Sequence, residues 1–139
     1  EVLGLRGGDL MGESWREPWV LLVEDAEQTR CLIADELREA GCRVWTASDG
    51  VEAVGILEAE RVDILFTDCE MPRMNGLELI RWTRAHLPHI PTVLMTGHER
   101  DAIGAEAWHC GALRLLLKPF SVEHLLLLVK ELRSLAISG

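Results

Sequence analysis

Five short apolar runs, separated by longer segments of helical period, constrain the fold of this chain more than any other feature. The runs are Trp19–Val23, Arg43–Ala47, Val62–Thr67, Pro91–Met95 and Leu113–Leu117. Most of their positions are apolar, which is typical of parallel strands that are covered on both faces. The segments with the spacing of amphipathic helices are Glu27–Ala40, Val51–Glu60, Gly76–Leu87, Glu99–Cys110 and Ser121–Leu135. This alternation predicts an α/β domain with a parallel sheet and right-handed crossovers.

Cap residues support the expected helix ends. Gly41 follows the first helix and Gly111 follows the fourth, where a left-handed residue commonly ends a helix. Asn75 and Ser121 stand where the side chain of an N-cap residue would start the third and fifth helices.

The first 18 residues contain four glycines and one proline and have no sustained period. We expect residues 1–18 to be a flexible extension, either native or left over from cloning. Residues 19–136 are expected to form one folded domain, and residues 137–139 a short tail.

Composition narrows the classes of function. The net charge of −9 argues against a nucleic-acid partner, because phosphate contacts need clustered Lys and Arg. No apolar run approaches the roughly 20 residues that span a membrane. Because no basic start is followed by an apolar stretch, we expect no secretory signal. The four cysteines form no C-x-x-C pair, which favours free thiols in a reducing, cytoplasmic setting.

Four of the five expected strands end at a polar, reactive side chain. The first ends in Glu24-Asp25, the third in Asp68, the fourth in Thr96 and the fifth in Lys118. Taken alone, each of these carboxylates is as well explained by a helix cap or a solvated turn. Thr96 alone would be an ordinary strand-end residue, and Lys118 alone a solvated lysine. Together they lie at the carboxyl edge of the sheet, where functional groups gather in such folds. Crowded carboxylates repel one another and favour a cation such as Mg²⁺, so the set indicates a phosphoryl-transfer site with a carboxylate nucleophile.

The residues from Asp68 to Gly76, DCEMPRMNG, resemble the D-x-x-M-P-x-M-[DN]-G signature of response-regulator receiver domains. The VLLVED run that ends at Asp25, the MTG around Thr96 and the KPF that begins at Lys118 match the other family motifs in order. The resemblance covers residues 19–136. It implies a flavodoxin-like, doubly wound five-stranded parallel sheet with strand order 2-1-3-4-5 and five helices.

The resemblance also implies a role in a two-component phosphorelay. A histidine kinase or a histidine phosphotransfer protein would pass a phosphoryl group from its phosphohistidine to Asp68. The domain would then be a signalling switch and not an enzyme. The only reactions that it would catalyse are its own Mg²⁺-dependent phosphorylation and dephosphorylation. By the same resemblance, Asp25 and Asp68 would bind Mg²⁺ directly, Glu24 would act mainly through water, and the backbone carbonyl of Glu70 would be a further ligand.

Other family motifs imply roles around the acyl phosphate. Lys118 would pair with it, Thr96 would hydrogen-bond to it after activation, and the Lys118–Pro119 peptide bond would be cis. Glu70 and His98 match positions that tune the lifetime of the acyl phosphate in this family. Ordinary solvated loop roles are an equal alternative for these two residues.

One position departs from the family pattern. Receivers usually carry Tyr or Phe three residues before the lysine, as a switch, and this chain has Leu115 there. One interpretation is that Leu115 simply fills a core position. The other is that switching is weaker than usual, or is transmitted by the fourth helix as a whole.

The last expected helix has more apolar surface than one core stripe needs. At 100° per residue the core stripe consists of Val122, Leu125, Leu126, Val129 and Leu132. Leu127 falls roughly opposite, while Leu128 and Leu135 form a shoulder outside the stripe. These residues, with Trp108, are either isolated exposed side chains or a docking face for a homodimer or partner, made by the fourth helix, fifth strand and fifth helix.

Two other classes of function remain. An unphosphorylated receiver-fold scaffold would serve only protein contacts, although the complete set of site residues argues against it. A small phosphohydrolase would be expected to carry D-x-D, whereas Glu70 follows Asp68 by two positions. The sequence leaves open the cognate kinase, the output, the oligomeric state, and whether the domain is free-standing or part of a hybrid kinase.

Overall fold

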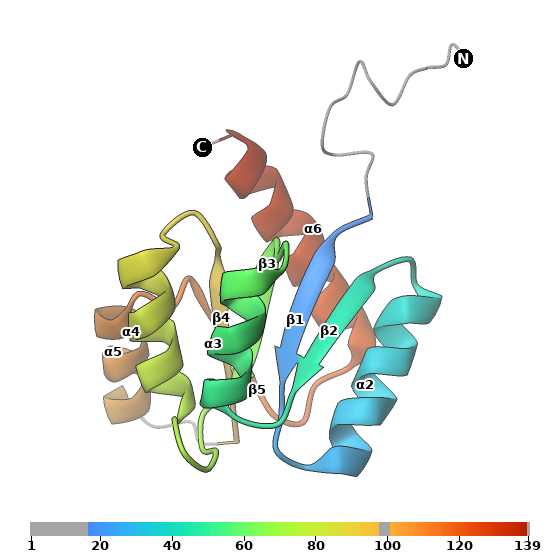
Figure 1. The fold of residues 1–139 in the computed structure, drawn as a ribbon. Coiled ribbons are helices and arrows are strands. Elements are labelled where there is room, and N and C mark those ends of the chain that lie inside the picture. Colours follow the sequence, from blue (N-terminus) through green and yellow to red (C-terminus); the bar gives the residue numbers. More distant parts are fainter. Residues whose placement is uncertain (1–16, 98–100, 139) are drawn as a thin grey trace.

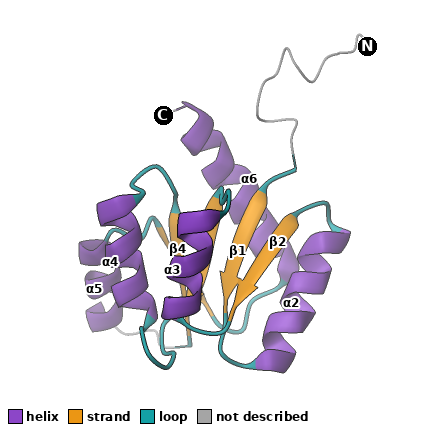
Figure 2. Ribbon diagram, in the orientation of Figure 1, coloured by secondary structure: helices purple, strands orange, loops and turns teal. Residues whose placement is uncertain are grey.

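The computed structural model describes residues 17–97 and 101–138. Its elements alternate along the chain: β1 (Trp19–Val23), α2 (Glu27–Glu39), β2 (Arg43–Ala47), α3 (Gly50–Ala59), β3 (Ile64–Asp68), α4 (Gly76–His86), β4 (Thr92–Thr96), α5 (Asp101–Cys110), β5 (Arg114–Leu117) and α6 (Val122–Ser138). Figure 2 shows the strands at the centre and the helices outside them. The predicted alternation of strands and helices is confirmed.

All strand pairs are parallel, and the order across the sheet is β2-β1-β3-β4-β5. Helices α2 and α6 cover one face, and α3, α4 and α5 cover the other (Figure 1). Successive residues of β1 therefore enter different cores: Leu21 packs with α3 and α4, and Leu22 packs with α2 and α6. The predicted doubly wound, flavodoxin-like sheet with order 2-1-3-4-5 is confirmed.

The central strands are buried along their whole length, as expected from their apolar runs. Their bounds differ from the prediction, because β3 begins two residues later than Val62 and ends at Asp68, and β4 begins at Thr92 and ends at Thr96. Pro91 has no N–H for the ladder, so it contributes only its carbonyl, which accepts a 3.0 Å bond from Leu65 N. Asp68 and Thr96 are consequently the last residues of their strands, with backbones held by the sheet.

The predicted capping residues are confirmed, and the helix bounds lie within one residue of the prediction except at the end of α6 and at the start of α5, where residues 98–100 are not described. Gly41 and Gly111 have φ of 101° and 105°, in the left-handed region that favours glycine. Asn75 Oδ1 accepts a 2.9 Å bond from Glu78 N, and Glu78 Oε1 accepts one of the same length from Asn75 N. Ser121 Oγ accepts a 3.3 Å bond from a backbone N–H of the first turn of α6. Helix α6 extends to Ser138, three residues beyond the expected end.

Two further expectations concern the cysteines and the membrane. All four cysteines are free thiols, with Cys31 exposed and the other three buried. No helix in the part of the chain that the structure describes is long and apolar enough to cross a membrane.

Candidate functional site

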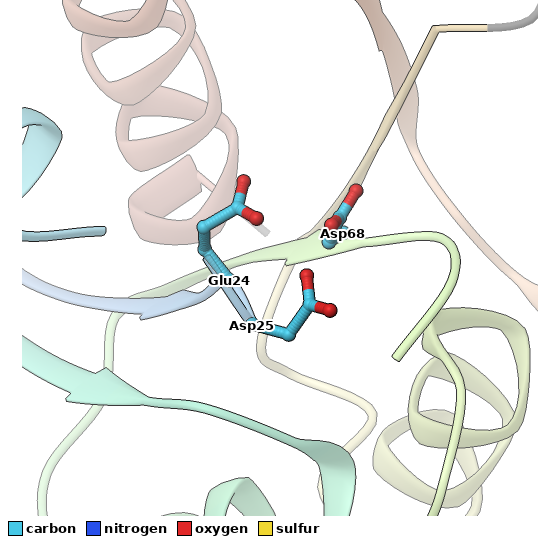
Figure 3. Close-up of side chains that lie close together, drawn as sticks. All are labelled: Glu24, Asp25 and Asp68. Atoms are coloured by element: carbon cyan, nitrogen blue, oxygen red, sulfur yellow. The ribbon is translucent and has the colours of Figure 1, made fainter. Parts of the chain in front are cut away.

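Three carboxylates converge at the carboxyl edge of the sheet. Glu24 and Asp25 follow β1, and Asp68 ends the neighbouring strand β3, so the parallel register brings them together. Each offers an oxygen, and these oxygens lie within 4.8 Å of one another (Figure 3). Glu24 is 2% exposed and Asp68 is 9% exposed, whereas Asp25 is open to solvent. The site is therefore a partly buried acidic pocket with one open side.

Lys118 brings a cation to this pocket from the end of β5. Its Nζ donates to Asp68 Oδ1 at 3.0 Å and to Glu24 Oε1 at 3.1 Å. The peptide bond that follows it, Lys118–Pro119, is cis as expected. One lysine thus bonds two of the three carboxylates.

Backbone donors orient the same acids. Asp68 Oδ1 also accepts a 3.1 Å bond from Cys69 N, and Glu24 Oε2 accepts a 3.2 Å bond from Ala26 N. The carbonyl of Glu24 in turn accepts a 2.9 Å bond from the Arg30 guanidinium. These bonds fix the two buried carboxylates on rigid backbone, as a preorganised site requires.

The pocket changes the acidity of its members. Burial raises the pKa of Asp68 to about 6, and the charge of Glu24 adds to this, while the hydrogen bond from Lys118 opposes it. Burial lowers the pKa of Lys118, but its bonds to Asp68 and Glu24 outweigh that effect and the net pKa is raised. The lysine therefore stays protonated and compensates only part of the negative charge.

The donor set fits a hard divalent cation. All its side-chain donors are carboxylate oxygens, which Mg²⁺ prefers, and the exposed Asp25 leaves room for the water ligands that Mg²⁺ usually keeps. Three ionised carboxylates and one lysine leave two negative charges, which one divalent ion would balance. Glu70 lies in the exposed loop between β3 and α4, two residues beyond Asp68.

Thr96 lies on β4, the strand between those that carry Asp68 and Lys118. It is 2% exposed, and its carbonyl accepts a 2.7 Å bond from Lys118 N. The preceding residue, Met95, is the register partner of Asp68. The structure therefore brings Thr96 to the same edge as the acids, whereas His98 lies outside the described residues.

Leu115 lies on β5 opposite Leu94 and is half-buried. It packs against a buried cluster formed by Cys69, Ile80, Leu94, Ala107, Cys110 and Ala112. Because Cys69 directly follows Asp68, Leu115 belongs to the packing between the end of β3 and helices α4 and α5. This position agrees with a side chain that fills the core.

Several large apolar side chains are exposed on helices α5 and α6 and along residues 113–117. Leu127 is 64% exposed, Trp108 54%, Leu113 42% and Leu117 37%. Leu128, expected outside the core stripe, is instead half-buried and packs against the core, because it lies one turn from both Leu125 and Leu132. The Leu135 side chain lies outside the described residues.

Asp49 and Arg73 form an ion pair near this edge that the motifs gave no reason to expect. Arg73 occupies a variable position of the signature, and Asp49 precedes it by 24 residues. The one available signal was Asp49-Gly50 at the start of an expected helix, which predicts only a cap.

Comparisons with known proteins show the family to which this chain belongs. A sequence profile described as response regulator receiver domain matches residues 20–130, so the chain belongs to the family of response regulator receiver domains. Receiver domains are the phosphoacceptor switches of two-component systems and are generally not true enzymes. They interact with histidine kinases or phosphotransfer proteins, and they bind Mg²⁺ at an acidic pocket.

Three relatives illustrate the range of proteins that contain similar domains. Transcription factor SKN7 of Chaetomium thermophilum is 34% identical over 143 residues, covering 94% of this chain and 19% of that protein. Sensor kinase CckA of Brucella abortus is 36% identical over 115 residues, covering 81% of this chain and 12% of the kinase. The structure of response regulator TrrA from Thermotoga maritima in complex with Mg²⁺-BeF is 29% identical, with a TM-score of 0.75, and covers 83% of this chain and 98% of its own.

Proposed function

We propose that this chain accepts a phosphoryl group from a phosphohistidine onto Asp68, and that the phosphorylated form signals to a domain or protein outside the chain. The observation that carries the proposal is the bond from Lys118 to Asp68 inside an acidic pocket. We also propose that residues 19–136 form the receiver domain, that residues 1–18 are an extension before it, and that residues 137–139 are a short tail.

The transfer is a displacement at phosphorus. A carboxylate oxygen of Asp68 attacks as the phosphorus–nitrogen bond of the phosphohistidine breaks, and the freed imidazole nitrogen takes up a proton. With a pKa of about 6 before any cation binds, Asp68 is mostly ionised at neutral pH, so its carboxylate is available to attack. Lys118, already bonded to Asp68, is placed to meet the negative charge of the incoming group.

Asp25 and Asp68 are the proposed direct Mg²⁺ ligands, with Glu24 acting mainly through water and the Glu70 carbonyl as a further ligand. The open side of the pocket and its all-oxygen donors support this set. When bound, Mg²⁺ would neutralise charge on the transferring phosphoryl oxygens. TrrA, a solved relative, is in complex with Mg²⁺-BeF.

After transfer, Lys118 would pair with the acyl phosphate and Thr96 would donate its hydroxyl to it. The position of Thr96 on β4, between the strands of Asp68 and Lys118, supports this role. Glu70 and His98 are proposed to tune the decay of the acyl phosphate. Glu70 is exposed and lies two residues beyond Asp68, which supports a role at the solvent side of the site.

A groove beside the pocket suits the phosphohistidine donor. It is an open cavity of about 720 Å³ between α2 and the start of α6. Glu24 and Lys118 line the end that faces the pocket, and Leu32, which is 61% exposed, lines it from α2. A partner lying in this groove would carry its histidine past Lys118 toward Asp68.

A second surface is proposed for output. We propose that the exposed side chains of Trp108, Leu113, Leu117 and Leu127 together form a face that docks a second copy or a downstream partner. The same face would serve an unphosphorylated scaffold, the alternative function.

Acetyl phosphate with Mg²⁺ distinguishes the two functions. We expect the intact mass of the wild type and of Asp35→Asn, an exposed acid outside the site, to increase by one phosphoryl group. Asp68→Asn should show no increase, and Lys118→Ala a much slower one. No increase in the wild type, or an increase retained in Asp68→Asn, would favour the scaffold.

A further inference from the structure

The loop that follows Asp68, residues 69–75, contains an unusual backbone conformation. Within the described part of the chain, Arg73 is the one residue other than glycine with positive φ, at 67°. This region is unfavourable for a residue with a Cβ unless the side chain is short and polar, as in Asn or Asp. Such conformations persist where surrounding contacts hold them, and they concentrate at functional sites.

A buried carboxylate holds Arg73. Its Nε and one terminal nitrogen donate to Asp49 Oδ2 at 3.0 and 2.8 Å. The Asp49 side chain is 9% exposed, and its other oxygen caps α3 by accepting a 2.8 Å bond from Glu52 N. The bonds from Glu52 N and from Arg73 lower the pKa of Asp49, which is therefore ionised at neutral pH. The Asp49 carboxylate thus joins the loop to the start of α3. It differs from the acid of an ordinary surface ion pair in being buried and in bonding the backbone of a helix as well.

Backbone contacts hold the loop on either side of this pair. Gly50 N donates to Met74 O at 3.2 Å, and a Cβ on Gly50 would lie 2.6 Å from that oxygen. Gly76 N donates to Cys69 O at 2.8 Å, and a Cβ on Gly76 would lie 2.0 Å from Asp68 O. The loop is therefore closed onto β3 at its ends and pressed against α3 at Met74.

We propose that the Arg73–Asp49 ion pair is a clamp that positions the loop carrying Glu70 for Mg²⁺ binding beside Asp68. The inference rests on the proposed function. Arg73 and Asp49 are positioning residues: they act on the Mg²⁺ site only through the backbone of the loop. Glycine would adopt the backbone of position 73 without strain, so the contact with Asp49 is what arginine adds there.

Two variants break the clamp and preserve the fold. Arg73→Gly removes the ion pair and also the unfavourable φ. Asp49→Asn keeps an oxygen to cap α3 but turns an amide donor toward Arg73. Arg81→Ala is the matched control, because Arg81 is similarly exposed and its ion pair with Glu106 is a single long contact of 3.9 Å.

We expect Arg73→Gly and Asp49→Asn to weaken Mg²⁺ binding about tenfold by titration calorimetry, as loss of groups that orient metal ligands does. Amide hydrogen exchange in residues 69–75 should become faster in both variants. The urea midpoint of Arg73→Gly should stay near that of the wild type, because relief of the unfavourable φ offsets the loss of the ion pair. The double variant should be no worse than the singles, because both remove one contact. Arg81→Ala should match the wild type throughout.

Unchanged Mg²⁺ affinity in both variants would overturn the clamp, whether or not the loop amides exchange faster. A weakening of equal size in Arg81→Ala would also overturn it, because the effect would then follow from lost surface charge. A wild type that binds no Mg²⁺ would instead refute the proposed function, and unchanged loop exchange in Arg73→Gly would then refute the clamp separately.

Discussion

Replacing Asp68 with Asn should stabilise the protein when divalent ions are removed. Asp68 is 9% exposed and its pKa is about 6, against an ordinary value of 3.8. A carboxyl group whose pKa is raised by folding has no effect on stability at a pH below its unfolded value. Its ionisation then opposes folding increasingly as the pH rises, and the cost is complete above the folded value. The pKa difference corresponds to a cost of about 3 kcal/mol.

Asn has the shape of Asp without its charge, so the substitution removes the cost of ionisation. It also weakens the hydrogen bond from Lys118, which offsets part of the gain, although Lys118 still has Glu24 as a partner. We therefore expect a net gain in the free energy of unfolding of roughly 1–3 kcal/mol at about pH 8. The assay is urea unfolding in EDTA, with Asp35→Asn as an exposed control that should change nothing. The gain should shrink toward pH 5 and also when Mg²⁺ is added, since the ion stabilises the wild type more. A variant no more stable than the wild type in EDTA at about pH 8 would refute the reasoning.

Three further variants test other parts of the site and surface. Lys118→Ala leaves two buried carboxylates without their cation, so urea unfolding without Mg²⁺ should show a loss of about 1–3 kcal/mol, and an unchanged midpoint would contradict this. Glu70→Ala should alter the decay rate of the phosphorylated protein, followed by intact mass, while leaving its formation possible; identical decay would leave Glu70 an ordinary loop residue. Leu127→Glu should convert any dimer to monomer in light scattering, and equal monomer masses for variant and wild type, with and without acetyl phosphate, would exclude a dimer through this face.

The sequence predicted most of the fold because its pattern has few solutions. Strands covered on both faces must be apolar at nearly every position, and five such runs alternating with helices leave little besides a parallel sheet. The strand order, in contrast, came from the family motifs, because periodicity does not order strands. Bounds moved where local chemistry intervened, as at Pro91, which cannot donate to the ladder.

The site could be predicted to the extent that it depends on strand ends. Glu24, Asp68 and Lys118 end neighbouring or nearly neighbouring parallel strands, so the topology alone brings them together. The Arg73–Asp49 contact depends on the path of a loop and on one side-chain conformation, neither of which has a sequence period. Leu128 was misplaced for a related reason, since a helical wheel gives angles and not the width of the core beside it.

Identifying the modified residue would test the central claim most directly. Borohydride reduces an acyl phosphate to an alcohol, so a phosphorylated aspartate becomes homoserine and releases phosphate. After treatment with acetyl phosphate and Mg²⁺, then borohydride, peptide mapping should find homoserine at position 68 and aspartate retained at position 25. Homoserine at Asp25 or at another acid, or none in a protein that has taken up phosphate, would contradict the assignment of Asp68 as the phosphoacceptor.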